Sequence, residues 1–279
     1  MKHKTTLTFL FIGISLFLIS CTDNTVNTKT VPPIKTSISI HTEMGLPTDK
    51  DSSDDYIINR PQYVVSYNKN LHVPNWVSWN LNASWYGDVP RFSGSFISDT
   101  SLPESFYRVK HSDYTNSGYD RGHMVRSEER TATDIDNKST FILTSILPQT
   151  PKLNQQTWLS LEYACEDWCK KNNKEIYVIA GGRFPKTPER LKGIVAVPDS
   201  CWKIVVIMNR GQKIADINPN TPVIAVMMSN SKTDSLSNTW KNYKTTVRHI
   251  EQSTGYNFFQ DIPKTTQDIL ETTINIVDP

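Results

Sequence analysis

The sequence has almost no excess of charge of either sign. Its 279 residues contain 30 Lys and Arg against 28 Asp and Glu, which gives a net charge of +2. Lys2 and Lys4, at the N-terminus, account for this difference. A protein coated in basic charge is therefore excluded, and any contact with nucleic acid has to use a local patch.

The chain also lacks the repeated apolar runs of a polytopic membrane protein. Charged residues make up 21% of it and the mean hydropathy is −0.44, which excludes that class. Aromatic residues make up 10%, so wholesale disorder is excluded as well. The length of 279 residues suits one large domain or two small ones.

One uncharged apolar run, residues 7–20, follows the two N-terminal lysines. Its 14 residues are too few to cross a bilayer comfortably and are typical of an export signal. Because the run ends at Ser20-Cys21, the segment resembles a bacterial lipoprotein signal. The resemblance implies that residues 1–20 are a signal peptide and that Cys21 is lipidated. The protein would then be anchored to a membrane of the bacterial cell envelope and be periplasmic or surface-exposed. The alternative is an ordinary secreted protein with an incidental Cys.

The segment that follows, residues 21–55, is rich in Thr, Ser, Asp and Pro. It contains six acidic residues, three lysines and few large apolar side chains. Such a composition does not bury enough apolar surface to fold. The sequence therefore predicts a flexible tether over residues 21–55 and a folded domain over residues 56–279.

Three further cysteines are Cys165, Cys169 and Cys201. Export would place them in an oxidising compartment. Cys165 and Cys169 lie four residues apart on one predicted helix, where a disulfide has poor geometry, so we expect Cys201 to pair with one of them. One thiol is then left over. A zinc site is not expected, because no His lies at a suitable short spacing from this pair.

Apolar runs and turn signals alternate along the rest of the chain. Short runs rich in β-formers predict strands at residues 63–67, 76–79, 141–144, 176–180, 203–208 and 223–228. Large apolar residues at helical spacing predict one helix around residues 158–168 and another from about residue 235 to 254. Strands and helices without a strict βαβ rhythm favour an α+β fold around a largely antiparallel sheet.

One stretch carries recognisable chemistry, Asp-Arg-Gly-His at residues 120–123. Pro-Gln at residues 148–149, Leu-Asn-Gln at 153–155, Trp158 and Leu-Glu at 161–162 follow in order. These ordered motifs resemble the DNA/RNA non-specific endonucleases, the ββα-metal family that includes mitochondrial endonuclease G. The resemblance covers about residues 60–270, nearly the whole predicted folded part.

The resemblance implies a ββα-metal nuclease fold, with a central, largely antiparallel sheet flanked by helices. It also implies hydrolysis of DNA and RNA to products with 5′-phosphate ends, with Mg²⁺ as cofactor and Mn²⁺ as a possible substitute. In the family, the residue at Asn154 binds the metal and the arginine at Arg121 helps to hold the charged transition state. Arg91 is our candidate for a second family arginine, on a loose alignment.

The same residues suit this chemistry on physical grounds. A histidine has an ordinary pKa of about 6.5, so much of His123 would be neutral near pH 7 and able to take a proton from water. Mg²⁺ prefers oxygen ligands, and an amide oxygen such as that of Asn154 can hold it. Glu162 lies eight residues further along one predicted helix, where it could bind water around the metal or orient an arginine. As alternatives, Asn154 would only cap that helix, and Glu162 would only be a solvated acid or a partner for a nearby lysine.

Other residues have supporting roles in this interpretation. Asp120 is expected to fix its loop through side-chain to backbone hydrogen bonds, and Gly122 to permit a close approach that a Cβ would block. The planar fork of Arg121 suits phosphate oxygens. Arg126 and Lys152 are candidate exposed contacts to phosphate. Phosphate and metal contacts carry no sequence information, so we expect little base preference.

Two positions depart from the family pattern. Ser145 stands where relatives commonly have Asn, and Glu166 stands where some carry an Arg, which reverses a charge near the predicted phosphate path. These departures motivate an alternative function, a catalytically inactive lipoprotein that binds nucleic acid or another polyanion. A third possibility is a phosphodiesterase that acts on a small molecule.

Overall fold

The computed structural model describes Met1 and residues 39–275. The predicted signal segment after Met1, Cys21 and the first part of the predicted tether lie outside the described residues. Within the described part, no helix combines the length and the apolar character that crossing a membrane requires.

The centre of the fold is a seven-stranded sheet in which every pair of neighbouring strands is antiparallel. It confirms the largely antiparallel sheet predicted from the sequence. In spatial order the strands are β1 (Tyr56–Asn59), β2 (Val64–Asn68), β3 (Val73–Leu81), β6 (Lys174–Arg183), β9 (Ser200–Asn209), β10 (Val223–Ser229) and β11 (Lys244–Thr245).

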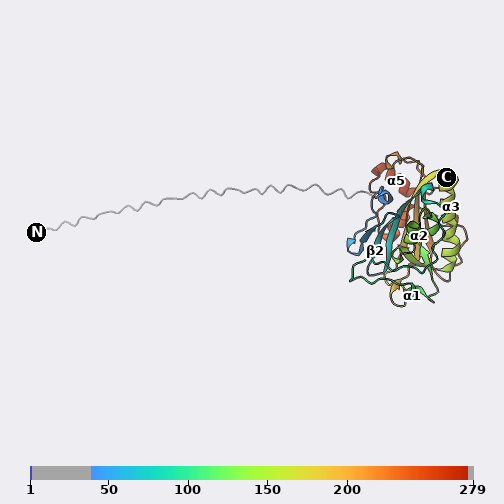
Figure 1. The fold of residues 1–279 in the computed structure, drawn as a ribbon. Coiled ribbons are helices and arrows are strands. Elements are labelled where there is room, and N and C mark those ends of the chain that lie inside the picture. The colour runs from blue at the N-terminus through green and yellow to red at the C-terminus, as the bar shows by residue number, and fades with distance from the viewer. Residues whose placement is uncertain (2–38, 276–279) are drawn as a thin grey trace. The chain divides into compact units, whose positions relative to one another are not determined.

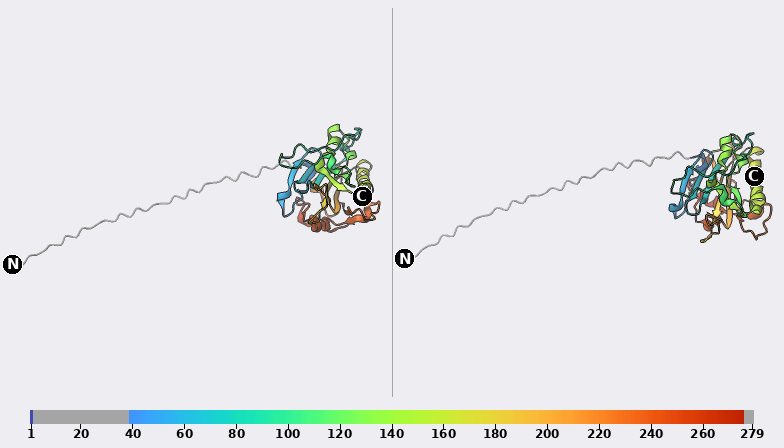
Figure 2. Two further views of the ribbon diagram at one scale, coloured as in Figure 1. Left: turned by 90° about the horizontal axis from the view of Figure 1, so that it is seen from below. Right: turned by 60° about the horizontal axis from the view of Figure 1, so that its bottom comes forward.

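The two faces of this sheet bury two separate hydrophobic cores, because side chains alternate along a strand. On one face, Val178 and Val205 pack in a cluster with Trp158 and Leu161 at the start of α3 (Leu159–Lys170). On the other face, residues such as Ile179 pack with α4 (Val247–Thr254) and α5 (Lys264–Thr272). Figure 1 labels α3 and α5, and Figure 2 shows the red C-terminal helices and the green segment on opposite sides of the strands.

Short elements complete the fold on the face that α3 covers. The small helices are α1 (His111–Tyr114) and α2 (Asp134–Ser139). Two hairpin-like pairs lie outside the main sheet: β4 (Asp120–His123) with β5 (Ile146–Gln149), and β7 (Arg190–Leu191) with β8 (Val195–Ala196).

The helix predicted from about residue 235 is wrong in its first half. There the chain forms a 3₁₀ turn, Trp240–Tyr243, and the short strand β11 before α4 begins at Val247. Trp240 is buried, as the pattern required, but it packs edge-on against Trp168 of α3 with ring centroids 6.1 Å apart. The apolar residues of this segment are therefore spaced as in a helix because they are buried, although the segment does not form one helix. The predicted helix end is confirmed, because Gly255 adopts a left-handed backbone with φ of 89°.

The strand predicted at residues 141–144 is also wrong. The chain forms a 3₁₀ turn at Leu143–Ser145 and enters β5 only at Ile146. Phe141 and Leu143 are nonetheless buried. A short apolar run fits a buried turn as well as a strand, so periodicity could not separate the two.

Residues 39–55, predicted as part of the tether, belong to the folded domain. His41 is 2% exposed, and its ring accepts a hydrogen bond from the backbone of Asn80 at 3.0 Å. Met44 is buried in the core on the α4 and α5 face. Thr48 forms a β-bridge with Asn257. Residues 39–55 therefore belong to the folded domain and not to a tether, because a few anchoring side chains fix a segment whose composition is polar.

The predicted disulfide is absent, since Cys165, Cys169 and Cys201 are all free thiols. All three side chains are buried, two on α3 and one on β9. Burial raises the pKa of the Cys201 thiol to about 12. The cysteines act here as small apolar core residues, a role that export does not preclude.

Candidate active site

The motif of residues 120–123 forms a strand, β4, that pairs antiparallel with β5. Gly122 lies opposite Leu147 and His123 opposite Ile146 in this pair. A Cβ on Gly122 would collide with the side chain of Gln149, which confirms the close approach expected there. After β5 the chain forms a π-helical turn, Leu153–Trp158, that continues directly into α3.

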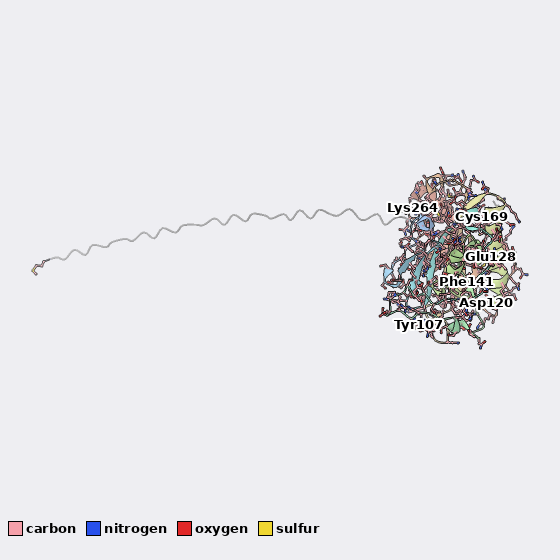
Figure 3. All side chains as sticks on the ribbon, viewed as in Figure 1. Tyr107, Asp120, Glu128, Phe141, Cys169 and Lys264 are labelled. Carbon is pink, nitrogen blue, oxygen red and sulfur yellow. The ribbon has the colours of Figure 1, made fainter. Side chains whose placement is uncertain are left out.

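A pocket of about 290 Å³ opens between β4, the π-helical turn and α3. It brings together five of the seven residues that the sequence singled out for catalysis, metal binding or substrate contact. Figure 3 labels Glu128, which lines the pocket. It also labels Asp120, which contacts Asn154 of the lining, and Phe141, which contacts His123. The lining residues are Arg91, His123, Arg126, Ser127, Glu128, Asn154, Gln155, Leu159, Glu162 and Tyr163.

His123 is held by aromatic rings at the base of this pocket. Its ring centroid lies 5.1 Å from that of Phe96 and 4.9 Å from that of Phe141. Nε2 is buried and has no hydrogen-bond partner among the described residues. Burial, helped by the charge of Arg91, lowers the pKa of His123 to about 3. The imidazole is therefore neutral near pH 7, and its Nε2 is not engaged by another described residue.

Asn154 lies within the π-helical turn, so the alternative that it only caps a helix is wrong. Its Nδ2 donates a hydrogen bond of 2.9 Å to Asp120 Oδ2, and Gln155 Nε2 donates one of 2.8 Å to the same oxygen. Asp120 thus binds two side chains of the next element, where side-chain to backbone bonds were expected. Because the amide nitrogen of Asn154 is engaged, its oxygen is the atom left to serve as a ligand.

Glu162 shares the pocket with Asn154, although the helix between them is not regular. The π-helical turn is wider than an α-helical one, so the angle calculated for a uniform α-helix does not apply. Glu162 is 5% exposed, which rules out a solvated acid, whereas the alternative of a lysine partner agrees with its ion pair to Lys203. Its carboxylate lies 3.6 Å from Lys203 Nζ and 3.9 Å from Arg126 Nε. Burial outweighs these two positive charges and raises the pKa of Glu162 to about 7.

Lys203 is a component of the site that sequence reasoning missed. Its side chain is 1% exposed, and Nζ lies 4.2 Å from the centroid of the Trp158 ring. A buried lysine requires a partner, and here that partner is Glu162. The available signal was a lysine inside the apolar run of residues 203–208.

Arg126 does not have the exposed position predicted for it. It is 9% exposed and forms ion pairs with Glu166 at 2.6 Å and with Glu128 at 3.2 Å, in addition to Glu162. Glu166 also pairs with Lys170 at 3.1 Å. The acid at position 166 is therefore neutralised by a guanidinium that the chain supplies from another segment. It does not stand as a free negative charge on the phosphate path.

The remaining basic residues occupy different places. Arg91 lines the pocket, with its guanidinium 5.0 Å from the centroid of the Phe141 ring. Arg121 lies outside the lining: its Nη2 donates to His111 O at 2.8 Å and its guanidinium stacks over Phe96. Lys152 is also outside the lining and donates to Gln156 Oε1 at 2.6 Å and Asn238 Oδ1 at 2.5 Å.

The two perturbed pKa values predict the acid limb of the pH–rate profile. A carboxyl with a raised pKa of about 7 loses its charge as the pH falls through that value, whereas His123 stays neutral down to about pH 3. We expect kcat to fall below about pH 7 because protonated Glu162 no longer balances Arg126 and Lys203. Initial rates between about pH 5 and 9 test this, and the limb should vanish in Glu162→Gln. A flat wild-type profile down to about pH 5 would contradict it.

Comparisons with known proteins agree with this architecture. The family model for the DNA/RNA non-specific endonucleases matches residues 41–265. The chain is 40% identical over 255 residues to a nuclease of Nostoc sp., covering 88% of this chain and 90% of that protein. It is 29% identical over 232 residues to nuclease C1 of Cunninghamella echinulata, covering 78% and 88%. The crystal structure of an EndoG/EndoGI complex matches with a TM-score of 0.66 and 24% identity, over 81% of this chain and 92% of that one.

The family match and the similarity to a nuclease define the class of the protein as a nuclease, and its fold is the ββα-metal nuclease fold. The chain belongs to the DNA/RNA non-specific endonuclease family.

Proposed function

We propose that this nuclease hydrolyses phosphodiester bonds of DNA and RNA in the pocket between β4 and α3, with His123 as the general base. The observation that carries the proposal is that His123, whose Nε2 has no hydrogen-bond partner among the described residues, lies in one pocket with Asn154 and Arg91. His123 would take a proton from the attacking water. The water oxygen bonds to phosphorus, the bond from phosphorus to O3′ breaks, and the departing O3′ takes a proton from solvent water, so the products carry 5′-phosphate and 3′-hydroxyl ends.

The charged residues of the pocket would stabilise the phosphoryl group during this step. Arg91 and Arg126 present guanidinium groups, which suit phosphate oxygens and keep their charge at any working pH. Glu162 acts through others, since its ion pairs with Arg126 and Lys203 fix the position of the Arg126 head group. Arg121 and Lys152, which lie outside the lining, would contact neighbouring phosphates of the strand.

The chemistry of the pocket fits a divalent cation bound through Asn154. Asp120 holds the amide nitrogen, and the remaining amide oxygen is a hard donor of the kind that Mg²⁺ and Mn²⁺ prefer. When bound there, the cation would relieve negative charge on the phosphoryl oxygens and the departing O3′. We propose Mg²⁺ as this cofactor, with Mn²⁺ as a substitute.

We propose further that the enzyme is a lipoprotein of the bacterial cell envelope, anchored through Cys21 and facing away from the cytoplasm. The support is the basic N-terminus and the short apolar run that ends at Ser20-Cys21. Incorporation of a labelled fatty acid, lost in Cys21→Ser, tests the anchor.

Digestion of plasmid DNA and of RNA, each with Mg²⁺, Mn²⁺ or EDTA, tests the proposed activity. We expect both polymers to be degraded to a smear of 5′-phosphorylated fragments with either metal and to stay intact with EDTA. Binding without cleavage under every metal would instead support an inactive nucleic-acid-binding protein. Turnover of a dinucleotide but not of either polymer would support a small-molecule phosphodiesterase.

A further inference from the structure

Two arginines of the pocket share a single carboxylate, that of Glu128. Arg91 Nη1 lies 2.9 Å from Glu128 Oε1, and Arg126 Nε lies 3.2 Å from Glu128 Oε2. Ser127 Oγ also donates to Oε2 at 3.0 Å. All four residues line the same pocket as His123 and Asn154. The carboxylate therefore bridges the two guanidinium groups inside the pocket.

In this bridge, the two carboxylate oxygens of Glu128 each face one guanidinium group, that of Arg91 or that of Arg126. A phosphodiester has the same feature, two non-bridging oxygens that share one negative charge, and guanidinium groups bind it in the same way. Burial opposes the charge on Glu128, but a hydrogen bond from its own backbone and the charges of Arg91 and Arg126 outweigh burial and lower its pKa. Glu128 is thus an ionised carboxylate near pH 7 and occupies both arginines.

Neither arginine depends on Glu128 for its position. Arg126 keeps its ion pair with Glu166 at 2.6 Å and its stacking on Tyr163, whose ring centroid lies 4.8 Å from the guanidinium. Arg91 keeps its stacking on Phe141 and a hydrogen bond to Ser127.

Glu128 itself is the least enclosed acid of the cluster. Its side chain is 40% exposed, against 7% for Glu162 and 23% for Glu166. It belongs to a 3₁₀ turn of only three residues, Ser127–Glu129. The side chain can therefore leave the pocket while both arginines stay in place.

We propose that Glu128 is an internal competitor of the substrate, a carboxylate that occupies the phosphate position between Arg91 and Arg126 and that the nucleic acid displaces on binding. This inference rests on the proposed function, because it takes the pocket to be the phosphate site. Glu128 thereby sets the affinity for the polyanion and excludes anions that do not offer enough further contacts to displace it. It limits binding and takes no part in the bond-breaking step.

The test compares Glu128→Gln with Glu166→Gln as a matched control. Both variants remove one carboxylate charge from Arg126, but only Glu128 bridges the two arginines and lines the pocket. Each is made in the full-length chain on a His123→Ala background, and EDTA is present so that no strand is cut. Fluorescence anisotropy of a labelled single-stranded DNA oligonucleotide then gives Kd as a function of salt.

We expect Glu128→Gln to lower Kd by about 3- to 10-fold, the effect of releasing two partly exposed ion pairs. The slope of log Kd against log salt should steepen by about one phosphate contact. Glu166→Gln should change Kd by less than about twofold. Glu128→Ala, which carries no amide, should reproduce the tighter binding, and thermal melting verifies that all variants are folded.

Two outcomes would overturn the proposal. If Kd is unchanged or rises in Glu128→Gln and Glu128→Ala, the carboxylate holds the arginines in position for substrate and does not compete with it. If Glu166→Gln lowers Kd as much as Glu128→Gln, the effect belongs to net charge and not to the bridge. Because binding is measured without cleavage, either result is separate from a failure of the wild-type enzyme to digest plasmid.

Discussion

Replacing His123 by alanine is expected to lower kcat for cleavage of both DNA and RNA by about 10²- to 10⁴-fold, with a much smaller effect on KM. The imidazole is the proposed general base, and burial beside Phe96 and Phe141 keeps it neutral near pH 7. Its loss would remove the proton acceptor for the attacking water. The arginines proposed to bind phosphate remain.

The matched control for this change is His249→Ala. His249 is exposed on α4, which packs on the opposite face of the sheet from α3, so its loss should leave kcat unchanged. Initial rates on plasmid and on RNA give the comparison, and the melting temperature of each variant controls for folding. A His123→Ala enzyme that keeps a rate near that of the wild type would exclude His123 as the base.

Asn154→Ala should reduce cleavage by about 100-fold or more, comparable with the effect of EDTA on the wild type. The alanine removes the amide oxygen that is left for the cation once Asp120 has bound the amide nitrogen. We therefore expect the half-saturating concentration of Mg²⁺ to rise and the residual rate to respond to added metal. Titration of the rate with Mg²⁺ and with Mn²⁺ measures both quantities.

Gln156→Ala is the matched control for Asn154→Ala. Gln156 lies on the same π-helical turn, is exposed and does not line the pocket, so its loss tests whether disturbing the turn is enough to stop cleavage. A large loss in Gln156→Ala would assign the effect of Asn154→Ala to the turn. Full activity of the wild type in EDTA would contradict a metal-dependent step altogether.

The residues that line the pocket were predicted to different degrees. His123, Asn154 and Glu162 stand in ordered motifs, and their types suit the chemistry, so the sequence predicted that they act together. Arg91 was a loose assignment, and the structure places it beside Phe141 in the same lining. Arg126 was predicted at an exposed position because its partners, the acids Glu162 and Glu166 of α3, are distant in the sequence and no local pattern indicates that they pack against it.

The errors in the fold have a common physical origin. The spacing of apolar residues indicates which side chains are buried. It indicates the type of secondary structure only where all of those residues belong to a single helix or strand. Strands β6 and β9 were predicted well because each is a single buried run. Residues 235–245 contribute Trp240 to the core without forming a helix, and residues 39–55 are anchored by His41 and Met44 despite a polar composition.

The sequence by itself determined the family motifs, the antiparallel sheet and which residues are the candidate base and the candidate metal ligand, because each depends on residue type and local order. The tertiary structure alone decided that the cysteines are free, that Lys203 lies under Glu162, and that Glu128 bridges Arg91 and Arg126. Each of these features depends on how far apart residues from distant segments lie in the folded chain. Burial and distance decide which charges pair and whether thiols can bond, and only the packed chain defines both.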